Sequence, residues 1–335
     1  MTAISNKMNE FAISEGTLLE MLQSPWCDYK TLKTPIIIRH HGRTAEQAVT
    51  FGWAEGFPNV VMLARDPECA KEVLDRYPNV KWAKEYYTDG VLKYTQLGAF
   101  KYCRDHGFKT CVMLDDDIGG FTVSFYRPSE NKMKLASQLF FPIDNKELSK
   151  KILAYCIRRS EALFKKHPDV GMVGWHHRSF GYLYQNCNVV DINGGYNDYA
   201  NGYIYNLEAI DRFGFELADE YDVHGENVGT YCGMLGLGMQ LACLTGACIS
   251  PSNDGDKSTL RTTSDAKTKN EEDWNKVKKL TPKVLSGLRR GKTGDQFIKI
   301  SWKNMNAVLG NRHTQERLFY NPDDIKITNP EEKKK

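Results

Sequence analysis

Residues 109–118 read KTCVMLDDDI, an apolar run that ends in three aspartates. The apolar part has the length of a buried strand, and the aspartates follow at its carboxyl end. Because side chains alternate along an extended chain, we expect Asp115 and Asp117 to lie on one side and Asp116 to face away. Two converging carboxylates suit Mg²⁺ or Mn²⁺, which few carboxylates bind together with phosphate oxygens. The alternative is a solvated acidic turn.

The sequence before this stretch alternates between strand signals and helix signals. Short β-branched runs indicate buried strands, and a capping-box pattern, a proline and closing glycines mark the helices between them. This alternation predicts an α/β fold with a mostly parallel sheet, helices on both faces, and ligands beyond the carboxyl ends of the strands. The predicted strands are 34–38 and 59–64, and the predicted helices are 44–56, 67–76 and 89–107.

The second half of the sequence is less regular. An amphipathic pattern predicts a helix over about 146–166, and apolar runs predict strands at 170–174 and 247–250. The aromatic and asparagine-rich stretch 182–205 indicates extended segments joined by turns. From Asp254 onward the composition turns polar and basic, which indicates a separate C-terminal subregion.

Composition and charge set wide limits on the class of protein. The chain has 335 residues, of which 41% are hydrophobic, so it can bury a full core. Its net charge of +3 is too small to identify a nucleic-acid-binding protein. The nine cysteines form no C-x-x-C pair and lie mostly in apolar stretches, which favours buried thiols in a reducing compartment. We therefore expect a cytoplasmic protein without a membrane span.

Two landmarks give the sequence a family resemblance. The first is a succession of elements: a strand, the R-x-x-G-R loop 39–43, a strand ending near Arg65, a helix, and then V-M-L-D-D-D-I. This succession resembles the nucleotide-sugar domain of GT-A glycosyltransferases. The second is 201–210 followed by Gly225-Glu226-Asn227, which is similar to the family's acceptor-side strand and helix with its glycine-acid-acid motif. Here Asn227 replaces the second acid.

Within that family, the chain resembles the TET-associated glycosyltransferases of phages and of base J synthesis, over about residues 33–250. The resemblance implies a GT-A type, Rossmann-like, mostly parallel sheet flanked by helices, with a mainly helical C-terminal extension. The implied organisation is an N-terminal extension (1–32), a nucleotide-sugar-binding half (33–120), an acceptor and catalytic half of the same domain (121–262), and a basic C-terminal subregion and tail (263–335).

The implied activity is metal-dependent transfer of a sugar from a UDP-sugar, with Mn²⁺ or Mg²⁺. The sugar is a pentose such as arabinose, or glucose. The implied acceptor is a hydroxymethylated or hydroxylated cytosine, or a sugar already on it, in phage DNA, and the protein would then act in the host cytoplasm. A flipped base would reach the donor, and the lysines of 267–292 could neutralise DNA phosphates.

The resemblance also implies roles for individual residues. Glu226, with Asp222 beside it, is expected to act as the general base or as a carboxylate that stabilises the reacting sugar. The expected metal ligands are Asp115, Asp117 and Asp254. The nucleotide sugar is expected to contact Arg39, Gly42, Arg43, Arg65, Lys93, Gln96, Asp115 and Asp116. The acceptor is expected to contact Trp175, His176, His177, Asn201 and Tyr203.

Two other functions fit the same sequence. A GT-A transferase can act on a glycan, a protein or a small molecule, because a fold does not determine the acceptor. A protein of another class, a non-catalytic module that binds nucleic acid or nucleotide sugars, is suggested by Asn227 in place of an acid.

Overall fold

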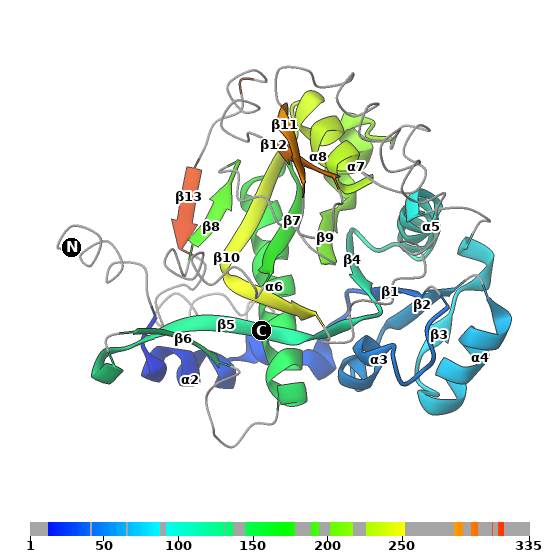
Figure 1. The fold of residues 1–335 in the computed structure, drawn as a ribbon, viewed down its shortest axis with the longest axis horizontal. Helices are drawn as coiled ribbons and strands as arrows, with labels where there is room; N and C mark the ends of the chain where they lie inside the picture. Colours follow the sequence, from blue (N-terminus) through cyan, green and yellow to red (C-terminus); the bar gives the residue numbers. More distant parts are fainter. Residues whose placement is uncertain are drawn as a thin grey trace, which may run out of the picture.

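The centre of the molecule is a mixed β-sheet with helices on both faces (Figure 1). The computed structural model describes residues 13–40, 42–64, 66–87, 92–130, 132–136, 145–177, 189–193, 202–216, 226–251, 285–290, 296–300, 310 and 314–317. Within these residues the main path of the sheet has the order β13-β8-β10-β7-β9-β4-β1-β2-β3, and β5 and β6 extend it from β10.

The strands of the first half follow the predicted pattern. They are β1 (Ile36–His40), β2 (Val60–Ala64), β3 (Lys81–Trp82) and β4 (Thr110–Asp115). The pairs β1–β2, β1–β4 and β2–β3 are parallel. β1 and β2 are buried at every position, as expected of strands covered by helices on both faces. The prediction of a mostly parallel α/β sheet is therefore confirmed for this half.

The second half completes the sheet with strands of both directions. β9 (Gly202–Asn206) runs antiparallel to both of its neighbours, β4 and β7 (Val170–His177). β10 (Gln240–Pro251) is parallel to β7 and antiparallel to β5 (Ile118–Arg127). The remaining strands are β6 (Lys132–Leu135), β8 (Val189–Ile192), β11 (Leu285–Arg290), β12 (Gln296–Ile300) and β13 (Thr314–Arg317).

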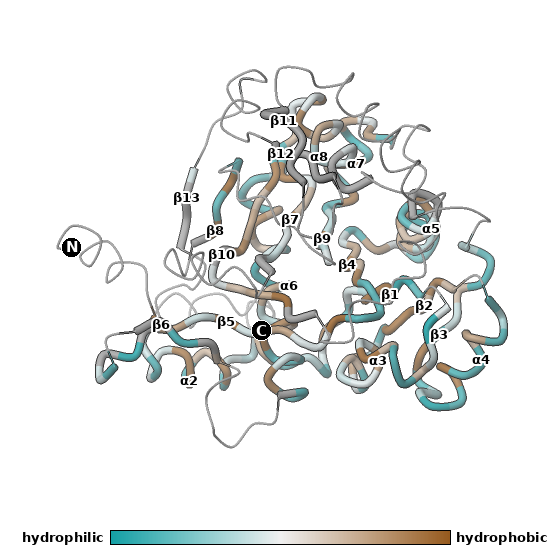
Figure 2. Tube along the Cα trace, in the orientation of Figure 1, coloured by the Kyte–Doolittle hydropathy of each residue, from teal (hydrophilic) through white to brown (hydrophobic). Residues whose placement is uncertain are grey.

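The buried apolar side chains of the described residues form two hydrophobic cores on opposite faces of the sheet. Even-numbered residues of β1 face one core and Ile37 faces the other, because side chains alternate along a strand. Figure 2 shows the hydrophobic residues concentrated in strands such as β2 and β10, whereas α4 is largely hydrophilic on its outer side. The first core is covered by α2 (Glu15–Gln23), α3 (Val49–Ala54), α4 (Pro67–Arg76) and α6 (Asn145–Lys166), and the second by α5 (Leu92–Asp105), α7 (Leu207–Phe213) and α8 (Glu226–Gly236).

The predicted helix over 44–56 begins later than expected. Thr44 and Gln47 do form the reciprocal capping box: the Thr44 amide donates to Gln47 Oε1 (3.2 Å) and the Gln47 amide donates to Thr44 Oγ1 (3.3 Å). The chain between them is a turn, however, and α3 starts at Val49. The helix predicted over 67–76 is confirmed as α4, which spans Pro67–Arg76. The helix predicted over 89–107 is α5, which ends at Asp105 with Gly107 two residues later at φ +72°, and its predicted start at 89 lies outside the described residues.

The prediction of a mainly helical C-terminal extension is wrong for the residues described there. β11 and β12 pair antiparallel, and β13 pairs with β8 of the main sheet. The lysine-rich composition suggested solvated helix, but β12 contains Phe297, Ile298 and Ile300, and aromatic and β-branched residues favour strands.

The segment before β1 is attached to α6. Arg158 of α6 donates hydrogen bonds to the carbonyl oxygens of Trp26 (2.6 Å) and Asp28 (2.8 Å) and to Thr31 Oγ1 (2.8 Å). A guanidinium group, with five donors in a fixed plane, can satisfy several acceptors at once. Among the helices of the described residues, none is long and apolar enough to cross a membrane.

Replacing Gly98 by alanine is expected to destabilise the fold. A Cβ atom on Gly98 of α5 would lie 1.9 Å from the carbonyl oxygen of Tyr86, so the helix would have to move away from that backbone. We expect a loss of about 1–3 kcal/mol in the free energy of unfolding, as is typical of overpacking. The control is Gly236→Ala in α8, where a Cβ atom meets nothing within 4 Å. Equal urea midpoints for the two variants would contradict this packing.

Candidate functional site

The candidate site lies where the chain changes from one face of the sheet to the other. The connections β1–α3–β2 and β2–α4–β3 cover the first face, and α5 then crosses the second face to place β4 on the other side of β1. β1 therefore lies between β2 and β4, with connections that run in opposite directions. In open α/β sheets such a switch point leaves a crevice outside the carboxyl ends of the two strands. His40 and Asp115 are the last residues of those strands.

Arg39 and Asp115 form an ion pair on the second face. They are partners in the register of β1 and β4, so their side chains leave the sheet side by side. Arg39 Nη2 donates to Asp115 Oδ1, and the side chains are 3% and 27% exposed. The arginine is thus enclosed by protein, whereas the carboxylate reaches the surface.

Asp116 lies on the first face and is almost completely buried. Its Oδ2 atom is 2.8 Å from His40 Nδ1, and its Oδ1 atom accepts from Arg43 Nη1. The side chains of His40 and Asp116 are 0% and 1% exposed. A buried carboxylate is tolerated when it is paired and hydrogen-bonded in this way. These contacts give Asp116 a structural role in the turn, and its predicted contact with the nucleotide sugar stays a prediction.

Arg43 joins two of the three aspartates. Besides its contact with Asp116, its Nη2 atom donates to Asp117 Oδ2 at 2.9 Å. Gly42, immediately before it, has φ +66°, a left-handed conformation that favours glycine. The loop after β1 therefore turns back so that one guanidinium bridges Asp116 and Asp117.

The alternation expected for the three aspartates ends at Asp115. β4 stops there, and Asp116 and Asp117 form the turn that leads into β5. Asp116 consequently does not face away from Asp117, because both contact Arg43. What separates their roles is burial, since Asp117 is 19% exposed and Asp116 is 1% exposed.

The backbone of the aspartate turn is bound to α3. Thr50 Oγ1 donates to the carbonyl oxygen of Asp115 (2.7 Å) and accepts from the Ile118 amide (2.8 Å). The Thr50 amide donates to the carbonyl oxygen of Asp116 (3.1 Å), and Trp53 Nε1 donates to that of Ile118 (2.6 Å). Both side chains are buried, so the conformation of the turn is fixed from the protein interior.

The electrostatics of the cluster favour an additional cation. Burial raises the pKa of Asp115, and the positive charge of Arg39 opposes that rise while the carboxylates of Asp117 and Asp116 add to it. Among the described residues of this cluster, three carboxylates face two guanidinium groups, which leaves a net negative charge with His40 set aside.

The donor set fits a hard divalent cation that also binds phosphate. The Oδ1 atom of Asp117 is buried without a hydrogen-bond partner among the described residues, so this carboxylate keeps a free coordination position. The described residues contain no group of three or more histidine, cysteine or acidic side chains placed to hold a metal. Mg²⁺ needs no such cage, because it binds one or two carboxylates and completes its shell with phosphate and water. Asp115 and Asp117 are the residues that would hold it.

Gln96, Tyr203 and Trp175 are buried in the protein core in this structure. Gln96 Nε2 donates to the hydroxyl of Tyr205 (3.1 Å), and the Tyr203 hydroxyl is 3.1 Å from that of Tyr231. Trp175 is 0% exposed and packs edge-on against Phe121. Gln96 was predicted to contact the donor, and Tyr203 and Trp175 to contact the acceptor. Here Gln96 lies in α5, Tyr203 in β9 and Trp175 in β7, central elements whose large side chains fill the core.

Several predicted residues lie outside what the structure describes. Lys93, His176, His177 and Glu226 belong to α5, β7 and α8, but only their backbone is described. The residues wholly outside the described part are Arg65, Asn201, Asp222 and Asp254. Their roles stay predictions.

His40 and Thr50 were not among the predicted site residues. For His40 a signal existed: it is adjacent to Arg39 on a strand, so alternation places it on the opposite face, where the second aspartate needed a partner. Thr50 gave no signal, because its contacts with the turn join residues 65 to 68 positions apart in the sequence.

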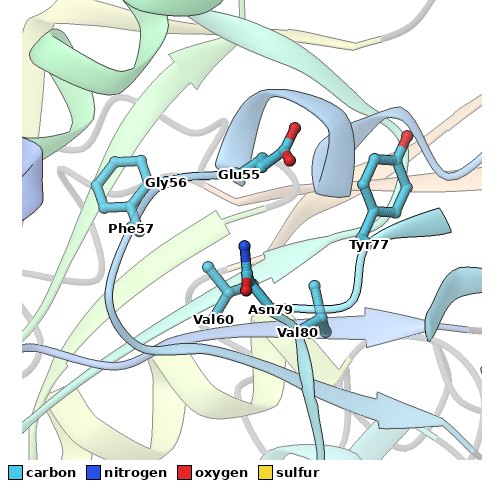
Figure 3. A pocket seen from close by; sticks show the side chains of 7 residues that line it. All are labelled: Glu55, Gly56, Phe57, Val60, Tyr77, Asn79 and Val80. Atoms are coloured by element: carbon cyan, nitrogen blue, oxygen red, sulfur yellow. The ribbon is translucent and has the colours of Figure 1, made fainter. Parts of the chain in front are cut away.

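A shallow hollow near β2 is a separate feature. Its lining includes Phe57, Val60, Tyr77 and Val80 (Figure 3), and its cavity volume is about 10 Å³. This is below the volumes of about 300–1,000 Å³ that are typical of ligand sites. It lies at the amino ends of β2 and β3, opposite the aspartates.

Comparisons with known proteins find structural similarity at a low level only. The sequence matches no protein-family profile and no curated protein sequence. The structure is similar to that of a cytidylyltransferase from Leptospira borgpetersenii, with 12% sequence identity and a TM-score of 0.34, covering 83% of this chain and 94% of the other.

Replacing Thr50 by valine is expected to destabilise the aspartate turn. Valine has nearly the same shape but leaves the Ile118 amide and the Asp115 carbonyl without the hydroxyl they share. We expect a loss of about 1–3 kcal/mol in the free energy of unfolding, measured by urea denaturation. Thr50→Ser, which keeps the hydroxyl, serves as the control and should retain most of the stability. If the valine variant were as stable as wild type, Thr50 would not hold the turn.

Proposed function

We propose that the chain is a metal-dependent glycosyltransferase that uses a nucleotide-sugar donor. The observation that carries the proposal is the position of Arg39, Arg43, Asp115 and Asp117 together at the switch point between β1 and β4. Ligands of open α/β sheets bind at such points. Carboxylates beside arginines suit a diphosphate that arrives with a divalent cation.

The roles of the residues follow from their exposure and contacts. Asp115 and Asp117 are the partly exposed carboxylates and would hold the cation, while buried Asp116 keeps Arg43 and the turn in place. When bound, the cation would supply charge neutralisation for the departing nucleoside diphosphate. Arg39 and Arg43 can donate to phosphate oxygens in the same crevice.

The acceptor side of the proposal rests on the family resemblance. Glu226, at the start of α8, is the proposed general base for the acceptor hydroxyl, with Asp222 as its neighbour. The proposed donor is a UDP-sugar, and the proposed acceptor is a hydroxymethylated or hydroxylated cytosine, or a sugar on it, in DNA. A glycan, protein or small-molecule acceptor is the second candidate.

The activity test uses purified protein, Mn²⁺, a panel of UDP-sugars, and DNA containing unmodified, hydroxymethylated or glucosylated cytosine. We expect mass spectrometry of the digested nucleosides to show a sugar added to modified cytosine alone. Unchanged DNA together with a mass gain on a glycan or protein would establish the second candidate instead. A protein that binds UDP-sugars and neither transfers nor hydrolyses them would be a binding module.

Replacing Asp117 by asparagine is expected to lower the Mn²⁺-dependent turnover of the UDP-sugar by at least about 100-fold, because the amide loses the charge that the cation needs. The matched control is Asp105→Asn at the end of α5, an exposed aspartate paired with Lys101. Turnover that is equal in the two variants would contradict a role for Asp117 in the reaction. Thermal unfolding of both variants checks that each is folded.

A further inference from the structure

Each of the two carboxylates proposed to hold a metal ion already forms an ion pair with an arginine. Asp115 accepts from Arg39, and Asp117 accepts from Arg43 Nη2 at 2.9 Å. A guanidinium on a carboxylate oxygen both occupies that oxygen and repels a metal ion placed beside it. A divalent cation that arrives alone therefore meets a site in which arginines hold its ligands.

The two arginines differ in how easily they can move away from their carboxylate partners. Arg39 is 3% exposed and lies between elements of the sheet, whereas Arg43 is 22% exposed and belongs to the loop after β1. Its neighbour Gly42 has open space around it, with nothing within 4 Å of a Cβ position. Arg43 can thus exchange partners at the surface, while the movement of Arg39 would disturb the core.

A diphosphate changes the balance of charge at this site. The described cluster has three carboxylates and two guanidinium groups, so a divalent cation alone would turn its net charge positive. The diphosphate of a nucleotide sugar alone, with about two negative charges, would make the net charge more negative. A cation and a diphosphate together add almost no net charge. Phosphate oxygens also give Arg43 an alternative bidentate partner to Asp117.

We propose that Arg43 competes with the divalent cation for Asp117 and is drawn off by the diphosphate, so that cation and diphosphate bind cooperatively. The proposal rests on the function proposed above and adds to it an exchange of partners at Arg43, from Asp117 to the diphosphate. Asp116 remains the fixed partner of Arg43, since its buried carboxylate needs a charged donor in either state. Only the contact between Arg43 and Asp117 is exchanged.

The test measures Mn²⁺ binding rather than turnover. The electron paramagnetic resonance signal of free Mn²⁺ is titrated with protein, in the absence and in the presence of saturating UDP. In wild type we expect UDP to raise the affinity for Mn²⁺ by about tenfold, within the range of about 5–150-fold found for coupled sites. By reciprocity, Mn²⁺ should raise the affinity for UDP by the same factor.

Arg43→Gln separates competition from a purely structural role. Loss of the competing cation should raise the affinity for Mn²⁺ alone by up to about fivefold, the strength of a partly exposed ion pair, and should reduce the enhancement by UDP. A structural role predicts the opposite for Mn²⁺ alone, a weaker affinity. Arg43→Lys keeps the charge but lacks the planar fork of donors with which arginine contacts Asp116 and Asp117, and it should lie between wild type and the glutamine variant.

The matched control is Arg104→Gln, which removes an exposed arginine that donates through Nε to Asp211 at 2.9 Å; it should behave as wild type. Mn²⁺ binding that is equal with and without UDP in wild type would overturn this inference alone. No Mn²⁺ binding even with UDP would overturn the proposed function, and the inference with it. Circular dichroism of each variant confirms that it is folded.

Discussion

The site depends on one interaction, the pairing of the buried Asp116 carboxylate with His40 and Arg43. A charge that is 1% exposed is stable only with partners, and His40 and Arg43 provide them from the end of β1 and the loop after it. This pairing connects the strand end, the loop and the aspartate turn in one network. Asp116 is buried, whereas the neighbouring carboxylates of Asp115 and Asp117 are partly exposed, so a ligand can reach them.

The topology of the sheet explains why this network forms at the centre of the molecule. β1 has β2 on one side and β4 on the other, reached through helices on opposite faces. The strand register places Arg39 beside Asp115, and α3 binds the turn backbone through Thr50. Positions on strands and short helices are held more rigidly than positions on long loops, so the arrangement favours a site with fixed geometry.

The sequence predicts the frame of this site better than its details. Apolar runs before Arg39 and Asp115 locate both strand ends, since buried strands need such runs. Alternation alone misjudges Asp117, because the chain turns after Asp115. The same rule, applied to Phe121, Val123 and Phe125, would have found β5, which was not predicted. Trp175 and Tyr203 look like ligand contacts in a polar stretch, yet tertiary pairing places them in central strands.

The central claim is that a cation and a nucleoside diphosphate bind at the carboxyl ends of β1 and β4. It is tested most directly by methyl NMR of isoleucine-labelled protein with Mn²⁺ and UDP, because the paramagnetic ion broadens signals near it. The account predicts that Ile38 and Ile118, next to the cluster, lose their signals first. Ile13 in the N-terminal segment and Ile210 in α7 should keep theirs. Broadening that spares Ile118 and affects Ile210 would contradict the account.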